Sequence, residues 1–367
     1  MARQGLQPSL LATGDASASQ PVAQDLAMAL AKRLISEENL GRAGLASSVY
    51  NGQAFIFGGH NGQKPLKTVE SFRPLEDAKD PGEWKEVPAM LARRTYATAC
   101  ELEGKIYVVG GSADGRTLNT FEVLDPESNE WDQWFTKPPM GTKRTMHGAA
   151  VAGGRLYVSG GFDGIRDLAS AEMYDPRSNS WSSSMDAMSV PRSYHVMVST
   201  GDKVYAIGGQ ERQVKDEQKP RAHQSIEAFE LYCERWLPMP PMSVGRIGAA
   251  ATTFQDEQGD HLIYVTGGSD GDQVLSSGEV FNPRLETWQE LPPMTVPRVG
   301  HCSFAIEGRV YVVGGMDGKV VLDTYEVFDL SEKSWSLPQH LGAERAGLGS
   351  NGLVVIELSN ALSPHCP

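Results

Sequence analysis

The stretches AEMYDPRSNSWSSSMDAM at residues 171–188 and PRSYHVMVSTGDKVYAIGG at 191–209 decide the fold, because their landmarks recur along the chain. The second stretch ends in a Gly-Gly doublet, with an aromatic residue three positions before the doublet and an arginine sixteen before it. The first stretch has a glutamate, an apolar residue two positions later and a tryptophan seven positions after that. These landmarks return in six copies about 50 residues apart, which predicts a repeat architecture.

The six copies share a doublet, an arginine, a glutamate and a tryptophan at matching places. The doublets are Gly58, Gly59, Gly110, Gly111, Gly160, Gly161, Gly208, Gly209, Gly267, Gly268, Gly314 and Gly315. The tryptophans are Trp84, Trp131, Trp181, Trp236, Trp288 and Trp335. The arginines are Arg42, Arg94, Arg144, Arg192, Arg246 and Arg298, and the glutamates are Glu70, Glu122, Glu172, Glu227, Glu279 and Glu326. We interpret all of them as structural: glycines for turns or close backbone approach, aromatics for packing between units, and arginine with glutamate as a repeated buried ion pair.

This combination resembles the kelch repeat over roughly residues 41–339. Each copy also reads as four short strands separated by turn residues, for example 146–152, 155–160, 170–175 and 180–184. Such a sheet is one blade of a propeller, and several blades around an axis cover each other's faces. The prediction is an all-β, six-bladed kelch β-propeller with a short disordered or helical N-terminal extension.

The domain organisation follows from the repeat boundaries. The propeller is predicted over 41–358, with repeats at about 42–90, 91–140, 141–188, 189–242, 243–294 and 295–341 and a closing strand at 344–358. The closing segment echoes the first repeat and is expected either to displace residues 43–50 as the innermost strand of the first blade or to cap the ring beside them. Residues 1–40 are expected to be disordered, with a short amphipathic helix at 25–38, or to be a targeting segment, and 359–367 form a tail.

Composition argues against several classes of function. The net charge of -13, without any basic run, disfavours nucleic acid as a partner. Apolar stretches fall short of the ~20 residues that a membrane span needs, and no secretory signal is recognisable. Four widely spaced cysteines, Cys100, Cys233, Cys302 and Cys366, fit reduced core thiols better than zinc ligands or disulfides. The chain is therefore expected in the cytoplasm, with the nucleus as the alternative.

Strand parity places the candidate binding face. With strands A to D numbered from the axis outward, the B-C loops share one face with the D-A connections, and the resemblance implies that this face binds protein partners at the mouth of the central shaft. Tyr96, Met146 and Tyr194 stand two residues after three successive arginines, where the other copies have glycine. We expect these three to contact a partner, although they could instead plug the shaft. Arg93, Phe162 and Met316 are further candidates, and packing under their own loops is the alternative for Phe162 and Met316.

The fourth copy has the longest B-C connection, QERQVKDEQKPRAHQ at 210–224. Its basic residues Arg212, Lys215, Lys219 and Arg221 are expected either to grip a partner or to belong to a solvated insertion.

Catalysis finds little support in the sequence. His147, His195 and His301 occupy equivalent places in three copies and are the only candidate metal ligands, since no iron-binding, phosphate-binding or nucleophile signature is recognisable. We predict no catalytic residues, no metal and no cofactor. The favoured function is a non-enzymatic protein-interaction module that binds a partner peptide or loop. The alternatives are a substrate-recognition subunit of a cullin-type ubiquitin ligase working through another chain, and a metal-dependent or sugar-modifying propeller enzyme.

Overall fold

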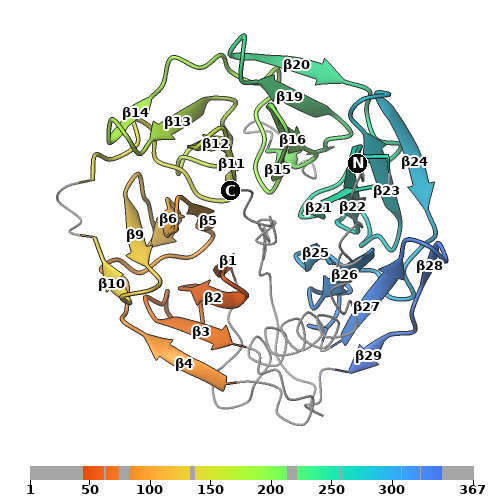
Figure 1. Ribbon diagram of the computed structural model, residues 1–367, viewed down its shortest axis with the longest axis horizontal. Coiled ribbons are helices and arrows are strands. Elements are labelled where there is room, and N and C mark those ends of the chain that lie inside the picture. The colour runs from red at the N-terminus through yellow and green to blue at the C-terminus, as the bar shows by residue number, and fades with distance from the viewer. Residues whose placement is uncertain are drawn as a thin grey trace, which may run out of the picture.

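The computed structural model describes residues 44–340 except 62, 74–82, 133–136, 213–220, 257, 307 and 323. All regular elements in this part of the chain are strands. Six antiparallel sheets are arranged radially around a central axis, as Figure 1 shows, and this confirms the predicted six-bladed propeller. Within the same residues, no helix has the length and apolar character needed to cross a bilayer. The N-terminal extension at 1–40, the closing strand at 344–358 and the tail at 359–367 lie outside the described residues.

Each blade consists of consecutive strands from one repeat, with the first strand innermost. Blades 1 to 3 are β1 (Ala46–Tyr50), β2 (Gln53–Phe57), β3 (Val69–Arg73) and β4 (Glu83–Val87); β5 (Thr98–Leu102), β6 (Lys105–Val109), β9 (Phe121–Asp125) and β10 (Glu130–Trp131); and β11 (Gly148–Ala152), β12 (Arg155–Ser159), β13 (Ala171–Asp175) and β14 (Ser180–Ser182). Blades 4 and 5 are β15 (Val196–Thr200), β16 (Lys203–Ile207), β19 (Ile226–Glu230) and β20 (Arg235–Met239); and β21 (Ala250–Gln255), β22 (His261–Thr266), β23 (Gly278–Asn282) and β24 (Thr287–Leu291). Blade 6 is β25 (Cys302–Ile306), β26 (Arg309–Val313), β27 (Thr324–Asp329), β28 (Ser334–Trp335) and β29 (Gln339–His340). Two small ribbons, β7 (Ser112–Ala113) with β8 (Arg116–Thr117) and β17 (Gln210–Glu211) with β18 (Arg221–Ala222), lie in B-C loops.

Blade 3 tests the strand prediction residue by residue. Three of its four strands begin within one residue of the predicted start, whereas β11 begins at Gly148 instead of 146. Met146 has a φ of 56°, a left-handed backbone conformation that no strand can include. The innermost strand therefore starts only after this turn.

In blades 1 to 5, the second glycine of the doublet joins the blade to the arginine that leads into the next blade. The amide of Gly111 donates a hydrogen bond of 2.8 Å to the carbonyl oxygen of Arg144, which leads into blade 3. A Cβ atom on Gly110 would lie 2.5 Å from the same oxygen, closer than any side chain can come. Equivalent bonds of 2.7 to 2.8 Å join Gly59 to Arg94, Gly161 to Arg192, Gly209 to Arg246 and Gly268 to Arg298. The glycines are thus required by close backbone approach between blades.

The arginines and glutamates form the predicted repeated ion pair. Arg144 has no exposed surface and lies 3.0 Å from the Glu172 carboxylate. It also donates to the carbonyl oxygens of Gly160 and Ser170, while Glu172 accepts from the backbone amides of Gly141 and Thr142. The other described pairs are Arg94 with Glu122, Arg192 with Glu227, Arg246 with Glu279, and Arg298 with Glu326. Each pair fastens the connection that enters a blade to that blade's own sheet, and the prediction is confirmed for these five copies.

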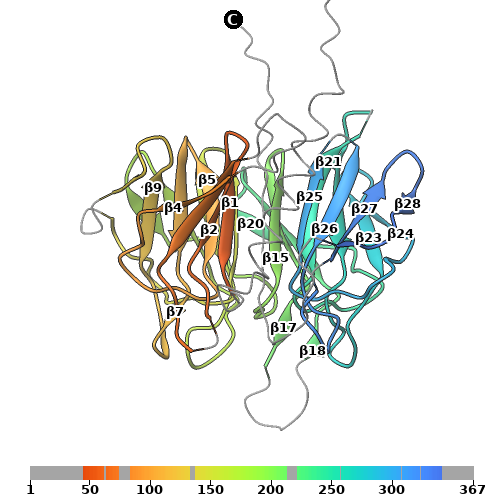
Figure 2. The same ribbon diagram turned by 90° about the horizontal axis from the view of Figure 1, so that it is seen from below.

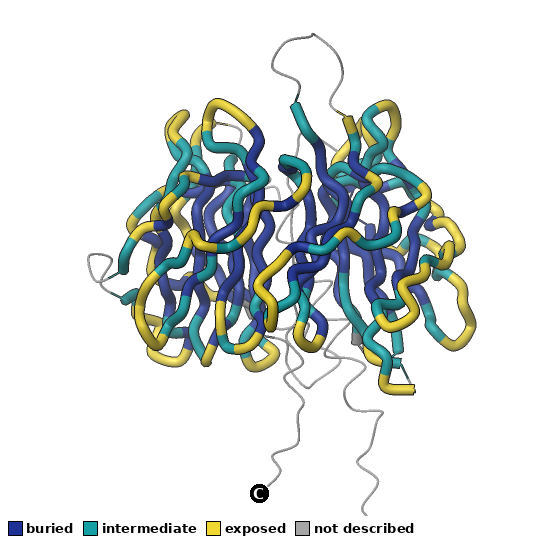
Figure 3. The backbone as a smooth tube through the Cα atoms, turned by 90° about the horizontal axis from the view of Figure 1, so that it is seen from above, coloured by how far each residue is buried: buried dark blue, intermediate teal, exposed yellow. Residues whose placement is uncertain are grey.

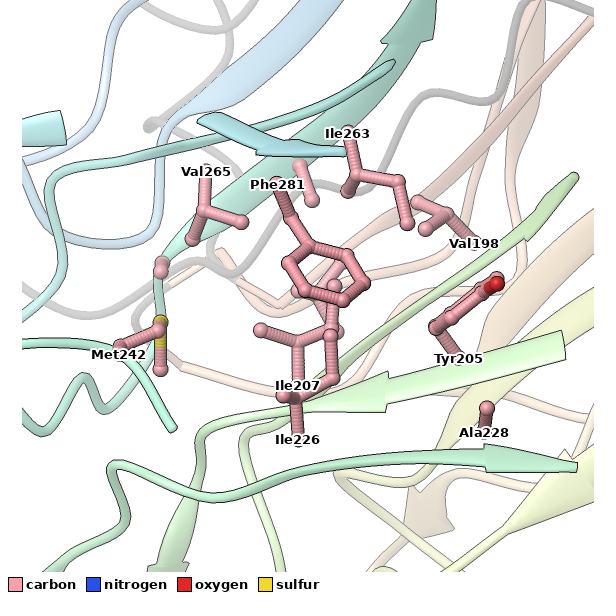
Figure 4. Packing of buried hydrophobic residues seen from close by; sticks show 12 residues of the cluster. Val198, Tyr205, Ile207, Ile226, Ala228, Met242, Ile263, Val265 and Phe281 are labelled. Carbon is pink, nitrogen blue, oxygen red and sulfur yellow. The ribbon is translucent and has the colours of Figure 1, made fainter. Parts of the chain in front are cut away.

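Apolar side chains fill the wedges between neighbouring blades. Figure 3 shows that burial is concentrated in the strands near the axis and falls off in the loops at both ends of the ring. Figure 4 shows the wedge between blades 4 and 5, where Ile207 and Ile226 pack beneath the Phe281 ring. Trp181 closes the wedge between blades 2 and 3, with its ring 5.5 Å from Phe121 and 5.3 Å from Tyr174.

Trp181→Ala is expected to lower the free energy of unfolding by about 3 kcal/mol, because truncation leaves a cavity beside Phe121 and Tyr174. Chemical denaturation monitored by circular dichroism measures the change. Tyr232→Ala is the control, since that side chain is 97% exposed and its loss should change stability by less than about 0.5 kcal/mol. Equal effects of the two substitutions would exclude the packing role of the tryptophan.

The innermost strand of blade 1 comes from the first repeat. Residues 46–50 form the innermost strand of blade 1 and pair with β2 along their full length, whereas the closing strand remains a prediction.

Cys100 and Cys302 are buried free thiols, but Cys233 is exposed in the turn before β20, so the core-thiol interpretation is wrong for that residue. The turn position explains the difference, because turns between outer strands face solvent.

Candidate functional site

Six residues, one at the entrance of each blade, form a ring around one end of the central shaft, on the face where β17 and β18 project in Figure 2, and five backbone hydrogen bonds join successive members from blade 1 to blade 6. We call this end the shaft mouth. Each bond runs from the residue two positions after a repeat arginine to its counterpart in the preceding blade. The distances are 2.6 Å from Tyr96 to Gly44, 3.0 Å from Met146 to Tyr96, 3.0 Å from Tyr194 to Met146, 2.9 Å from Gly248 to Tyr194 and 2.9 Å from Gly300 to Gly248. The ring thus places three bulky side chains side by side in blades 2 to 4.

All six ring residues have left-handed backbone conformations, with φ between 53° and 64°. Glycine adopts this conformation without strain, whereas a residue with a side chain pays of order 1 kcal/mol or more. Blades 1, 5 and 6 have Gly44, Gly248 and Gly300 at the ring, but blades 2 to 4 have Tyr96, Met146 and Tyr194 at strained positions. The shaft mouth therefore has large side chains at the ring positions of one half and glycines at those of the other half.

The large side chains contact one another and remain partly exposed. The rings of Tyr96 and Tyr194 lie 6.0 Å apart at 83°, an edge-to-face arrangement across blade 3. Burial raises the pKa of both hydroxyls above the usual value, and their mutual hydrogen bond partly opposes this for Tyr96. The three side chains are half-buried, so they present an apolar surface with two hydroxyl groups at the shaft mouth.

Arg212 brings the fourth B-C loop over blade 3. Its guanidinium carbon lies 4.6 Å from the centroid of the Phe162 ring, and its Nη2 lies 3.2 Å from the sulfur of Met146. The backbone amide of Arg212 donates a 2.6 Å hydrogen bond to the carboxylate of Asp167 in the third B-C loop. Three residues from the sequence prediction, Met146, Phe162 and Arg212, therefore meet at the junction of blades 3 and 4.

The other predicted contact residues lie apart from this junction. Arg93 is 45% exposed and lies 3.7 Å from Asp114 in the second B-C loop. Met316 pairs with Val299 in blade 6, on the glycine side of the shaft mouth. Arg221 is exposed on β18, and Lys215 and Lys219 lie outside the described residues.

Comparison with known proteins decides the family. The kelch-repeats domain described for KLHDC2, KLHL20 and DRC7 matches residues 34–209 and 97–296, and the kelch motif matches 297–340. The chain belongs to the kelch-repeat family. Because the matches extend over most of the chain, they also confirm the resemblance inferred from the sequence.

Shorter stretches resemble curated proteins. They match F-box/kelch-repeat proteins of Arabidopsis thaliana, At4g39580 at 49% identity over 13% of this chain and At1g22040 at 33% over 27%, and beta-scruin of Limulus polyphemus at 28% over 31%. The matched stretches span only 13, 20 and 12% of these relatives' own lengths. Among solved structures, that of YjhT superimposes with a TM-score of 0.64 at 15% identity, covering 82% of this chain and 97% of that one, which shows a shared fold.

In this kelch propeller, each of the three equivalent histidines forms a hydrogen bond with a hydroxyl group of the preceding blade. The Nε2 atoms of His147, His195 and His301 lie 2.9 to 3.1 Å from hydroxyl oxygens of the preceding blade, on Thr98, Ser159 and Thr266 respectively. Burial lowers the pKa of His147 and His301 to about 3, and that of His195 well below its usual value. Among the described residues, no three histidine, cysteine or acidic side chains are grouped as metal ligands would be. The histidines of this kelch chain hold blades together, and their arrangement does not favour the metal-dependent alternative.

Asp167 is a residue of the shaft mouth that the sequence analysis missed. It is 7% exposed, one oxygen binds the Arg212 amide, and the other oxygen has no hydrogen-bond partner. The sequence contained a sign of this role, because Asp167 is acidic where the matching positions of other kelch copies carry the uncharged residues Pro65, Thr117, Val274 and Val321. A lone carboxylate among such residues indicates a local function, here the anchoring of the neighbouring loop.

Proposed function

We propose that this kelch propeller is a non-enzymatic protein-interaction module that binds an extended peptide or loop of a partner at the shaft mouth. The observation that carries the proposal is the retention of Tyr96, Met146 and Tyr194 at left-handed backbone positions. Backbone strain of this kind is common at functional sites. Glycine occupies the same left-handed position in the three other blades, so the backbone conformation itself does not require a large side chain. Tyrosine and methionine suit a binding surface, because they offer apolar area together with hydroxyl or polarizable groups.

The shape of the shaft mouth supports an extended ligand. Large side chains on one half offer contact area, while the glycines on the other half add no side chains to the opening that a peptide would cross. A peptide that crosses the opening would therefore place its side chains against Tyr96, Met146 and Tyr194.

Replacing Tyr96, Met146 and Tyr194 together by glycine is expected to abolish partner binding while the propeller stays folded. Glycine removes the contact surface and relieves the backbone strain, whereas alanine would retain the strain. Affinity purification with mass spectrometry, comparing the wild type with this triple glycine variant, measures the difference. Circular dichroism and thermal unfolding verify the fold.

The matched control is Tyr232→Ala with Leu285→Ala, which removes two exposed apolar side chains from turns on the opposite face. Partners that bind the wild type and the control, but not the triple glycine variant, would support the shaft mouth as the binding site. Equal recovery of the partners by all three proteins would place the site elsewhere and contradict the proposal.

A second candidate function is recognition of substrates for a cullin-type ubiquitin ligase through another chain. It is favoured by the similarity to F-box/kelch-repeat proteins, of which this chain matches kelch stretches. Co-purification of a cullin with the wild-type protein, retained in the triple glycine variant, would support this role, because the ligase contact would lie away from the shaft mouth. Recovery of shaft-mouth partners without a cullin would exclude it.

A further inference from the structure

A cleft of about 830 Å³ opens between blades 5 and 6, which are neighbours in Figure 1. The turns that border it join strands A to B and C to D, so it lies on the face opposite to the shaft mouth. Apolar side chains from both blades form its floor: Phe254, Leu262, Tyr264, Val280, Leu291 and Phe328. Because Phe254, Leu262 and Leu291 are only partly buried, apolar surface stays open to solvent in this cleft.

Leu262 stands where the other copies have a polar residue. Five positions before the doublet, those copies carry Gln53, Lys105, Arg155, Lys203 and Arg309. In blades 3, 4 and 6 this base forms an ion pair with the acidic residue that ends the third strand, in Arg155–Asp175, Lys203–Glu230 and Arg309–Asp329. Blade 5 has Leu262 and Asn282 at the two positions. It therefore lacks, at the floor of the cleft, the charged pair of those three blades.

The turn between β21 and β22 supplies a different ion pair. It spans residues 256–260, whereas the matching turns of blades 1 to 4 have two residues each. The carboxylate of Asp260 accepts two hydrogen bonds of 2.6 Å from the guanidinium of Arg284. The acidic partner thus comes from the longer turn instead of the third strand, and the cleft has an apolar floor with a polar border.

The border of the cleft has an excess of acidic side chains. In the part of the chain that the structure describes, the acids that line or flank the cleft are Asp256, Asp260, Glu286, Glu290, Asp329 and Glu332, and the bases are Arg284, Arg309 and Lys333. Arg284 and Arg309 are already paired with Asp260 and Asp329. The other four acids form no ion pair with any described residue, and only Lys333 remains to balance them. The cleft therefore favours a positively charged ligand.

The strands under the cleft offer no free backbone edge. β22 pairs with β21 and β23, and β27 pairs with β26 and β28, so the N-H and C=O groups of these floor strands are already used within the sheets. A peptide buried here must satisfy its own backbone groups, and an α-helix does so within one segment. Amphipathic helices bind apolar grooves through side chains spaced three and four residues apart.

We propose that the cleft between blades 5 and 6 binds an amphipathic helix of a protein partner. Apolar side chains of the helix pack on the floor around Leu262, and its lysine or arginine side chains lie beside Asp256 and Glu290. The inference goes beyond the proposed function, because it gives the propeller a second binding site on the face opposite to the shaft mouth.

Selection from a displayed library of helices of about five turns tests the proposal. One face of each helix varies among apolar residues, and the other face carries lysine, glutamate or glutamine in equal proportion. Helices enriched on the wild type relative to the variant Leu262→Arg, Asn282→Asp are synthesised, and their dissociation constants are measured. This variant is expected to stay folded, because it introduces the ion pair that blades 3 and 6 already have. We expect the enriched helices to be rich in lysine and to lose binding when proline interrupts them.

The charge of the border is tested with Asp256→Asn, Glu290→Gln. This pair of substitutions should weaken binding of the enriched helices about tenfold, because it removes two carboxylates beside the ligand. Glu130→Gln, Glu234→Gln is the matched control: it removes two exposed carboxylates at or beside the C-D turns of blades 2 and 4, on the same face, and should bind like the wild type. The triple glycine variant should also bind like the wild type.

Several results would overturn the inference. They are enrichment of no helix over the Leu262→Arg, Asn282→Asp variant, enrichment of acidic or uncharged helices, and binding that persists after proline interrupts the helix. Equal weakening by the cleft pair and the control pair would do the same, because attraction by the net charge of -13 would then explain the binding. Binding lost in the triple glycine variant would place the helix at the shaft mouth instead. The proposed function is tested by loss of partners from the triple glycine variant, so the two proposals fail separately.

Discussion

Lowering the pH from 7 to 5 is expected to destabilise the propeller by about 2 kcal/mol for each of His147 and His301. Burial lowers the pKa of both imidazoles to about 3, whereas the unfolded chain keeps a value near 6.5. Between these values the unfolded state binds more protons than the folded state, so stability is complete above pH 6.5 and falls as the pH decreases toward 3. His195, whose pKa is also lowered by burial, acts in the same direction.

Denaturant unfolding at a series of pH values measures this effect. His147→Gln and His301→Gln should each reduce the slope of unfolding free energy against pH by about one proton, because glutamine does not titrate. Thr98→Val is the matched control: it removes the hydroxyl bound by His147 but leaves the buried imidazole, so it should lower stability while the slope persists. A slope unchanged in both glutamine variants would show that these histidines do not govern acid unfolding.

The spacing of landmarks within one repeat was sufficient to predict contacts inside a blade and at its entrance. Arg144 and Glu172 lie in one repeat, and their regular spacing predicted the ion pair that the structure shows. The positions of Tyr96, Met146 and Tyr194 around the shaft also followed, because equivalent residues of a propeller are related by rotation about its axis.

Contacts between different loops could not be derived in this way. Arg212 crosses from blade 4 to blade 3 and binds Asp167, although nothing in the spacing of either repeat links the two residues. Likewise, the bond between His195 and Ser159 depends on the distance between neighbouring blades, not on the sequence of one blade. Sequence periodicity specifies the repeated unit, while irregular loop contacts depend on three-dimensional packing around the whole ring.

Arg144→Ala is expected to lower the free energy of unfolding by about 3 to 5 kcal/mol, because it leaves the buried carboxylate of Glu172 without its cation. The substitution also leaves the carbonyl oxygens of Gly160 and Ser170 without the donors they have in the wild type. Denaturant unfolding at pH 7 provides the measurement. Arg166→Ala is the control, since that side chain is 74% exposed and should change stability by less than about 0.5 kcal/mol.

The double variant Arg144→Met, Glu172→Gln separates charge from packing. It is expected to recover part of the lost stability, because no uncompensated charge remains and glutamine can still accept a hydrogen bond from Gly141. If the double variant is less stable than Arg144→Ala, the pair acts through packing and hydrogen bonds to the carbonyl oxygens, not through its charges. Because Arg144 precedes Met146 by two residues in the same connection, this brace also supports the binding half of the shaft mouth. A loss of the brace should therefore weaken partner binding even where the propeller remains folded.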